Sequence, residues 1–317
     1  LCLQSKKPGR TLELARESMR LYREFLDELG ERAEFARTGS LAVAQTAEEW
    51  RGLRAHVRRL KDAGVEVELL GKRDARQLEP ELSERVMGAS LAPGDARINP
   101  LKLLAALEAG CERLGVKMLR GCEVKNVERA DRMLRVDGKS VVEARKVVLC
   151  AGAWTGELAS RLGIRIGVLP RRGQVLVTER MHEMLRHPII TAGYLSAKFS
   201  TRRVPRAWAG SLSVEQSEQG SVLIGGVREF AGFDIRVSAG AMRDLAREAV
   251  ELLPRLGGAM AVRCFAGLRP YTESGQPVMG EATEWPGLFV AAGHEGDGIA
   301  LAPVTAKMVA KQIVTSG

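Results

Sequence analysis

The most constraining feature of this sequence is an apolar run that leads directly into a glycine-rich turn and then into a helix. Leu288 to Ala292 is unbroken and apolar, Gly293, Gly296 and Gly298 follow, and an apolar helical segment continues to Val314. Such a run is typical of a strand covered on both faces. Glycines after it let the backbone approach a ligand, and amides at a helix start favour an anion. An ordinary strand-to-helix turn is the alternative.

A second segment in the middle of the chain repeats this arrangement. Val147 to Cys150 is a strand-like run, residues 151–154 form a turn with one glycine, and Thr155 is expected to cap a helix to Leu162. Two such turns favour a large nucleotide-type cofactor lying along strand ends. Taken alone, this turn is explained as well by a packed strand-to-helix connection.

Helices and strands alternate in the rest of the chain, around a strand-rich middle. We expect helices over 11–29, over 46–63 behind a capping box formed by Thr46 and Glu49, over 74–78, over 100–114 and, after Ser238, to Leu253. Strands are expected over 40–44 and 65–70, in a meander over 116–150, and over 168–235, which includes a polar, irregular insert from Thr201 to Gly220. The pattern predicts an α/β or α+β fold with two domains woven from discontinuous segments.

Composition narrows the function classes. The 317 residues allow one large or two ordinary domains, and a hydrophobic content of 45% excludes general disorder. The net charge of +9 permits a nucleic-acid binder, but aromatic residues make up only 4% and the arginines are scattered through periodic segments. We therefore expect no nucleic-acid partner, while keeping such a binder as a lesser alternative.

The expected cellular location follows from sequence features that are not seen. No apolar run reaches the ~18 residues that a membrane span needs, and the start at Leu1 shows no signal-peptide pattern. The five cysteines form no CxxC pair, which is typical of reduced thiols in a cytoplasmic protein. Four scattered histidines predict no metal site.

Arg269 lies in a segment whose backbone is expected to be rigid. Arg269 follows Gly267 and Leu268 and precedes Pro270, at the end of an apolar run. A guanidinium held in this way suits a planar, bidentate clamp on a carboxylate. A surface ion-pairing arginine is the alternative.

These motifs together resemble a known family. The segments 267–270, 273–280, 287–294 and 298–303 are similar to the C-terminal region of FAD-dependent amine oxidoreductases, the D-amino acid oxidase superfamily, in its group of glycine oxidase, sarcosine oxidase, D-hydroxyproline dehydrogenase and hydrogen cyanide synthase. Residues 147–158, 99–100 and 170–174 match the family pattern as well. The resemblance covers essentially the whole chain, in order.

The resemblance implies FAD as cofactor and assigns roles to single residues. Arg269 would bind the substrate carboxylate, with help from Tyr194, for which a half-buried strand tyrosine is the alternative. Backbone at Val124 would meet the adenine end of FAD. The remaining cofactor residues are Ala151, Gly152 and Trp154 along the FAD, and Gly293, His294, Gly296, Gly298 and Ile299 at the isoalloxazine.

The family also implies two domains. A Rossmann-like FAD-binding domain would comprise residues 1–35, 93–165 and 262–317, and a substrate domain with a mixed, largely antiparallel sheet would comprise 36–92 and 166–261. The family pattern opens with a strand and G-x-G-x-x-G, and no such motif lies before Thr11. The resemblance therefore implies a start roughly 50 residues into that pattern, with the first βαβ unit missing.

The implied activity is oxidation of a small amino or imino acid, such as glycine, N-methylglycine, a D-amino acid or hydroxyproline. A hydride would pass to the flavin and leave an imine. One alternative is a dehydrogenase subunit that passes electrons to a partner or to a quinone, which would place it at the periphery of the inner membrane. Another is a truncated, non-catalytic remnant. The expected partner is the amino-acid substrate, and either a homo- or a hetero-oligomer is allowed.

Overall fold

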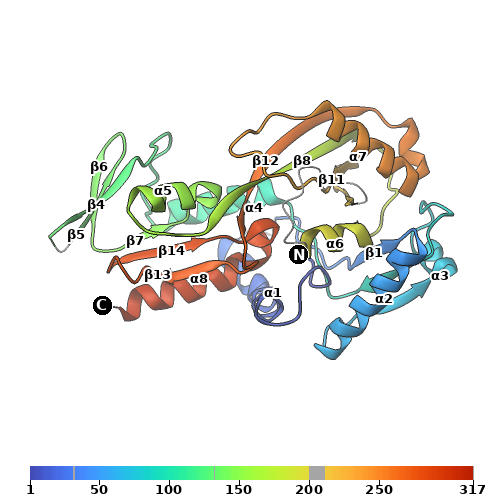
Figure 1. Cartoon of the computed structure of the whole chain (residues 1–317), viewed down its shortest axis with the longest axis horizontal. Coiled ribbons are helices and arrows are strands. Elements are labelled where there is room, and N and C mark those ends of the chain that lie inside the picture. Colours follow the sequence, from blue (N-terminus) through green and yellow to red (C-terminus); the bar gives the residue numbers. More distant parts are fainter. Residues whose placement is uncertain (31–32, 132, 200–210, 317) are drawn as a thin grey trace. The chain divides into compact units, whose positions relative to one another are not determined.

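The computed structural model describes residues 1–30, 33–131, 133–199 and 211–316 (Figure 1). The chain divides into two compact units, each built from three segments. The first unit comprises Leu1–Glu13, Glu34–Asn99 and Arg172–Leu268, and the second comprises Leu14–Ala33, Pro100–Arg171 and Arg269–Gly317. Which unit carries which function stays a prediction.

An eight-stranded sheet organises the first unit. Its order is β12-β8-β11-β10-β9-β1-β3-β2. The strands are β1 (Ser40–Ala44), β2 (Glu68–Gly71), β3 (Gly88–Ala92), β8 (Val168–Arg180), β9 (Ile189–Thr191), β10 (Ser213–Gln216), β11 (Ser221–Gly225) and β12 (Ala261–Thr272). The sheet is mixed, because β1 runs parallel to β9 and antiparallel to β3. The unit boundary falls within β8 and within β12.

Both faces of this sheet are covered. All of β1 is buried, and its side chains alternate between two cores: Leu41 and Val43 face one, Ala42 and Ala44 the other. The first core includes residues of α7 and the second includes residues of α2. The helices of this unit are α2 (Ala47–Asp62), α3 (Lys72–Leu78), α6 (Ala192–Phe199) and α7 (Ala239–Leu252).

Helix starts in this unit largely follow the predicted capping residues. Thr46 Oγ1 accepts from the amide of Glu49, and the Glu49 carboxylate accepts from the amide of Thr46, so the predicted capping box is confirmed. Ser238 caps α7 through the amide of Ala241, also as expected.

The second unit is built around a smaller sheet of order β13-β14-β7. Here β14 pairs in parallel with β7 and antiparallel with β13, and α8 packs along β13 and β14 (Figure 1). A separate meander has the order β4-β5-β6. The elements are α1 (Arg10–Leu29), α4 (Pro100–Arg113), β4 (Asn126–Ala130), β5 (Met133–Asp137), β6 (Val141–Ala144), β7 (Val147–Leu149), α5 (Thr155–Arg161), β13 (Val278–Glu281), β14 (Leu288–Ala292) and α8 (Gly298–Thr315). This mixed α/β architecture confirms the expected fold class.

A proline inside α8 is accommodated by two side chains of α1. Pro303 has no N–H, so the carbonyl of Ile299 lacks its helical donor. The buried hydroxyl of Tyr22 donates to that carbonyl, and Ser18 Oγ accepts from the amide of Val304 at 3.4 Å. Burial raises the pKa of Tyr22, so the phenol keeps the proton that it donates.

Tyr22→Phe is expected to destabilise the fold by about 1–3 kcal/mol, because it leaves the Ile299 carbonyl without the Tyr22 donor. Urea unfolding measures this loss. In a Pro303→Ala background the backbone N–H gained at position 303 can donate to the Ile299 carbonyl. Tyr22→Phe should therefore lower the free energy of unfolding by clearly less in that background. An equal cost in both backgrounds would contradict this explanation.

The structure corrects three local expectations. Residues 192–199 form α6 rather than loop or strand, so Tyr194 is a helical residue. Thr155 is the first residue of α5 and does not cap it by a side-chain hydrogen bond. The insert expected from Thr201 to Gly220 contains β10, and its residues 201–210 lie outside the described part of the chain.

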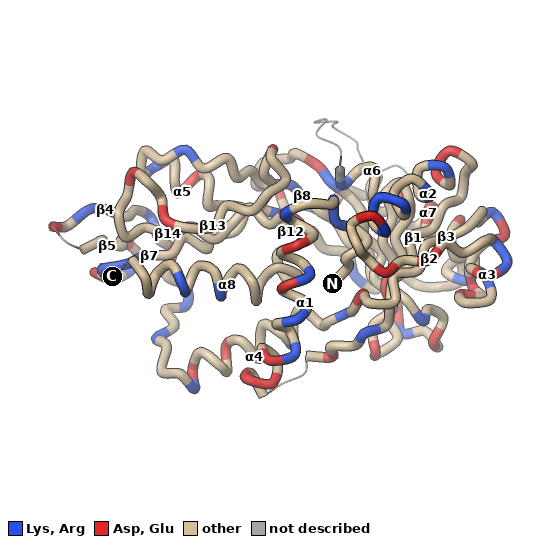
Figure 2. Tube along the Cα trace, turned by 90° about the horizontal axis from the view of Figure 1, so that it is seen from below, with Lys and Arg blue, Asp and Glu red and all other residues tan. Residues whose placement is uncertain are grey.

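Charge of both signs is distributed along the elements. Along α1, for example, Arg residues are interspersed with Glu and Asp (Figure 2). Within the part of the chain that the structure describes, none of the helices combines the length and apolar character that crossing a membrane requires.

Candidate cofactor and substrate site

The two predicted turns lie at the same edge of the smaller sheet. Strands β7 and β14 are adjacent and parallel, with Leu288 opposite Val147 and Val290 opposite Leu149. Each strand is followed by a 3-10 turn, η1 (Gly152–Trp154) or η3 (Glu295–Asp297), and then by a helix. The carboxyl ends of parallel strands are where open α/β sheets bind ligands.

Glycines shape both turns. Gly152 has φ +54° and Gly293 has φ +80°, a backbone region that favours glycine. A Cβ on Gly293 would also lie 2.6 Å from Cγ2 of Thr272. Position 293 therefore requires glycine for two independent reasons.

The residues at this edge fit a flat, partly apolar cofactor. The side chains of Trp154 and Ile299 are 53% and 41% exposed, although both are large and apolar. Thr155 is fully buried, and its Oγ1 has no hydrogen-bond partner among the described residues. The starts of α5 and α8 add backbone amides that suit an anionic group. These features are compatible with FAD, whose ring system is flat and whose phosphates are negative.

His294, between β14 and η3, is held as a neutral ring. Its Nε2 lies 3.0 Å from Thr305 Oγ1, and that hydroxyl donates to Met279 Sδ at 3.3 Å. Because the single hydroxyl proton is used on Met279, Nε2 carries the hydrogen and donates to Thr305. Burial lowers the pKa of His294 below its ordinary value, against a smaller opposing effect of Asp297.

Stability should therefore depend on pH through the buried histidines. Burial lowers the pKa of both His294 and His56 in the fold, so the unfolded chain binds more protons near and below pH 6.5. Unfolding free energy should fall as the pH drops below 6.5, by up to about 1.4 kcal/mol per pH unit for each histidine.

Urea unfolding between pH 5 and pH 8 (roughly the range in which histidine titrates) tests this. His294→Gln should make the dependence on pH shallower than in the wild type. Identical slopes for the His294 variant and the wild type would contradict the assignment.

Arg269 lies beside the second turn. It stands half-buried near the end of β12, and a Cβ on Gly296 would be 3.7 Å from its Cδ and Nε atoms. The arginine stem therefore lies beside η3, where a side chain at position 296 would meet it. The structure thereby brings the predicted carboxylate clamp together with the predicted flavin-lining turn.

Tyr194 and Val124 occupy different surroundings. Tyr194 belongs to the first unit, where the guanidinium of the buried Arg228 lies 4.2 Å from its ring centroid. Val124 belongs to the second unit, in exposed chain just before β4. Their roles toward carboxylate and adenine stay predictions.

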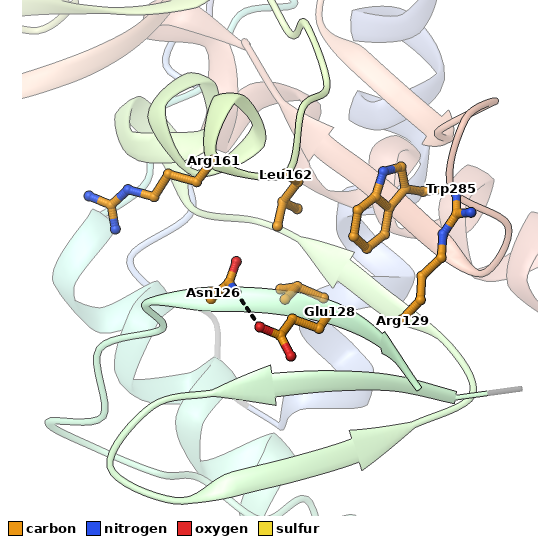
Figure 3. A pocket seen from close by; sticks show the side chains of 7 residues that line it. Asn126, Glu128, Arg129, Arg161, Leu162 and Trp285 are labelled. Atoms are coloured by element: carbon orange, nitrogen blue, oxygen red, sulfur yellow. Dashed lines mark hydrogen bonds between the residues drawn. The ribbon is translucent and has the colours of Figure 1, made fainter. Parts of the chain in front are cut away.

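A separate hollow of about 510 Å³ lies between β4 and the C-terminal end of α5 (Figure 3). Arg129 and Arg161 stand at its two ends, and Arg129 stacks at 4.9 Å on the ring of Trp285. The glycine turn lies at the N-terminal end of α5, whereas this hollow lies at its C-terminal end. The hollow is therefore distinct from the site described above.

The sequence interpretation missed two contacts of this site. Thr305, which orients His294, lies inside a helix with no motif of its own. Arg171 pairs with Glu295 at 3.7 Å, and it was included only as part of a family match. For the pairing of Arg171 with Glu295, the signal available in the sequence was a charged residue, Glu295, inside the glycine-rich turn.

Comparison with known proteins finds relatives that cover most of this chain. The chain is 32% identical to the glycine oxidase of Geobacillus kaustophilus over 304 residues, which are 94% of this chain and 76% of that protein. A hydrogen cyanide synthase subunit of Pseudomonas aeruginosa is 30% identical, over 94% of this chain and 69% of its own length.

The fold comparison points the same way. The crystal structure of the Geobacillus kaustophilus glycine oxidase superposes with a TM-score of 0.88 at 29% identity, over 98% of this chain and 80% of that one. The family described as FAD dependent oxidoreductase matches residues 2–312. With the glycine turns, the exposed apolar side chains and this match in agreement, the chain belongs to the FAD-dependent oxidoreductase family.

Proposed function

We propose that this chain oxidises a small amino or imino acid at the carbon that carries the nitrogen. The observation that carries the proposal is the position of Arg269 beside Gly296, where an added Cβ would lie 3.7 Å from the arginine Cδ and Nε, in the turn that the family resemblance assigns to the flavin. An arginine there would hold a substrate carboxylate while the neighbouring carbon faces the cofactor. The similarity to glycine oxidases supports the same substrate class.

Each residue has a limited chemical task. When bound, FAD supplies the two-electron acceptor for a hydride that leaves the substrate carbon. Arg269 binds and orients the carboxylate through paired N–H bonds. A neutral substrate amine then donates its lone pair to form the C=N bond as the hydride departs, and water later adds to that imine. His294 stays neutral and serves to shape the turn.

Two measurements test this function. Purified protein should show the visible absorption of an oxidised flavin, and that absorption should bleach when glycine, N-methylglycine, a D-amino acid or hydroxyproline is added without oxygen. A protein that binds no flavin would overturn the proposal and favour a non-catalytic remnant.

A dehydrogenase subunit is the second candidate, favoured by the similarity to a protein named as a subunit. Stopped-flow mixing of the reduced protein with oxygen separates the two. Rapid reoxidation identifies an oxidase, and slow reoxidation that a dye or quinone relieves identifies a dehydrogenase. The five free cysteines support a reducing compartment such as the cytoplasm in either case.

A further inference from the structure

Arg171 is a buried charge that points toward the turn beside Arg269. Its side chain is 3% exposed, Nη1 lies 3.7 Å from Oε1 of Glu295, and the guanidinium stacks 5.0 Å from the ring centroid of Tyr271. A buried guanidinium is stable only when its charge is compensated. The Glu295 carboxylate and the face of the Tyr271 ring both contribute to that compensation.

Glu295 has an unfavourable backbone conformation. Its φ is +50°, which side chains other than glycine rarely adopt, and it stands between two glycines of the turn. The two carboxylate oxygens of Glu295 both support this backbone conformation. Oε2 accepts from the amide of Gly296 at 2.5 Å, and Oε1 faces Arg171.

The strained residue directly precedes Gly296, the glycine beside Arg269. We propose that Arg171 is a positioning residue, which through Glu295 holds the turn of residues 294–298 in the shape that places Gly296 against Arg269. This inference rests on the proposed function, because it assigns Arg171 a part in binding the substrate carboxylate. If Arg171 is removed, the positive φ at Glu295 loses its support and the turn relaxes.

A pair of double variants isolates this effect. Arg171→Met/Glu295→Ala and Arg171→Met/Glu295→Gly carry the same charge, but only glycine adopts φ +50° without strain. We expect the alanine double variant to raise KM for glycine or N-methylglycine about tenfold, with a much smaller change in kcat, and the glycine double variant to restore KM toward the wild-type value. Hydrogen exchange at residues 294–298 should be faster in the alanine variant alone.

A purely structural role for Arg171 predicts equal KM and equal exchange in the two double variants, and that result overturns the proposal. If neither double variant folds, Glu295→Gln keeps an acceptor for Gly296 but removes the charge. Raised KM and faster exchange in this variant support the proposal, and wild-type values for both overturn it. If the wild-type protein turns over no amino acid, the proposed function fails, while hydrogen exchange in Glu295→Gln against the wild type still decides whether the pair of Arg171 and Glu295 holds the turn.

Discussion

Arg269→Ala is expected to lower kcat/KM for the amino-acid substrate by about 10²-fold or more, chiefly through KM. The variant would remove the proposed bidentate, charge-assisted contact with the substrate carboxylate, and truncating one partner of such a pair costs about 2–5 kcal/mol. The flavin spectrum should stay unchanged, because the proposal gives Arg269 no part in holding FAD. Steady-state kinetics and a visible spectrum of the same preparation measure both.

Two controls sharpen this result. Arg269→Lys keeps the charge but loses the planar fork, so its kcat/KM should lie between those of the wild type and the alanine variant. Dimethylamine matches N-methylglycine without its carboxylate, and the alanine variant should discriminate little between the two. Unchanged KM for N-methylglycine in Arg269→Ala would rule out the carboxylate clamp.

Gly156→Ala is expected to destabilise the protein by about 3 kcal/mol or more. Gly156 is the second residue of α5, and a Cβ there would lie 2.1 Å from the carbonyl oxygen of Val168, at the start of β8. That oxygen belongs to the backbone, so relief requires the helix and the strand to move apart. The shift would also displace the turn before α5. The denaturant midpoint in urea measures the loss.

Gly52→Ala is the matched control. Gly52 is also helical, within α2, and a Cβ there meets nothing within 4 Å. Because alanine favours helix over glycine, this variant should gain up to about 1 kcal/mol. Wild-type stability for Gly156→Ala would mean that α5 stands further from β8 than the structure shows.

The sequence predicted local structure wherever the signal was local. The capping box at Thr46, the cap at Ser238 and the strand–turn–helix after Leu288 are all encoded within a few residues, and the structure contains each of them. Helix α6 was missed although a signal exists, since Thr191 Oγ1 accepts from the amide of Tyr194 in its first turn. A threonine between two apolar runs is too common to indicate a cap.

The candidate site was harder to predict from the sequence, because its contacts join distant segments of the chain. The family resemblance identified the class of protein and the glycines, and the family match confirms that class. The pairing of Arg171 with Glu295 and the position of Arg269 beside Gly296 depend on how β8, β12 and η3 come together, which no local pattern encodes. Pro303 did indicate that a helix carbonyl would lack its usual donor, but no residue near Pro303 in the sequence identifies Tyr22 as the replacement.

The pairing of β7 with β14 has a consequence for biosynthesis. The sheet of the second unit needs Val147 and Leu288 side by side, so its parallel pair is absent until the ribosome has made the chain through β14. Such pairing gives a high contact order and slow folding. Until then β7 lacks its partner strand, and Leu158 and Ala159 of α5 lack Leu288 and Val290, with which they share a core, which leaves a nascent surface prone to aggregation. Expression of this protein should therefore benefit from slow synthesis or from added chaperones.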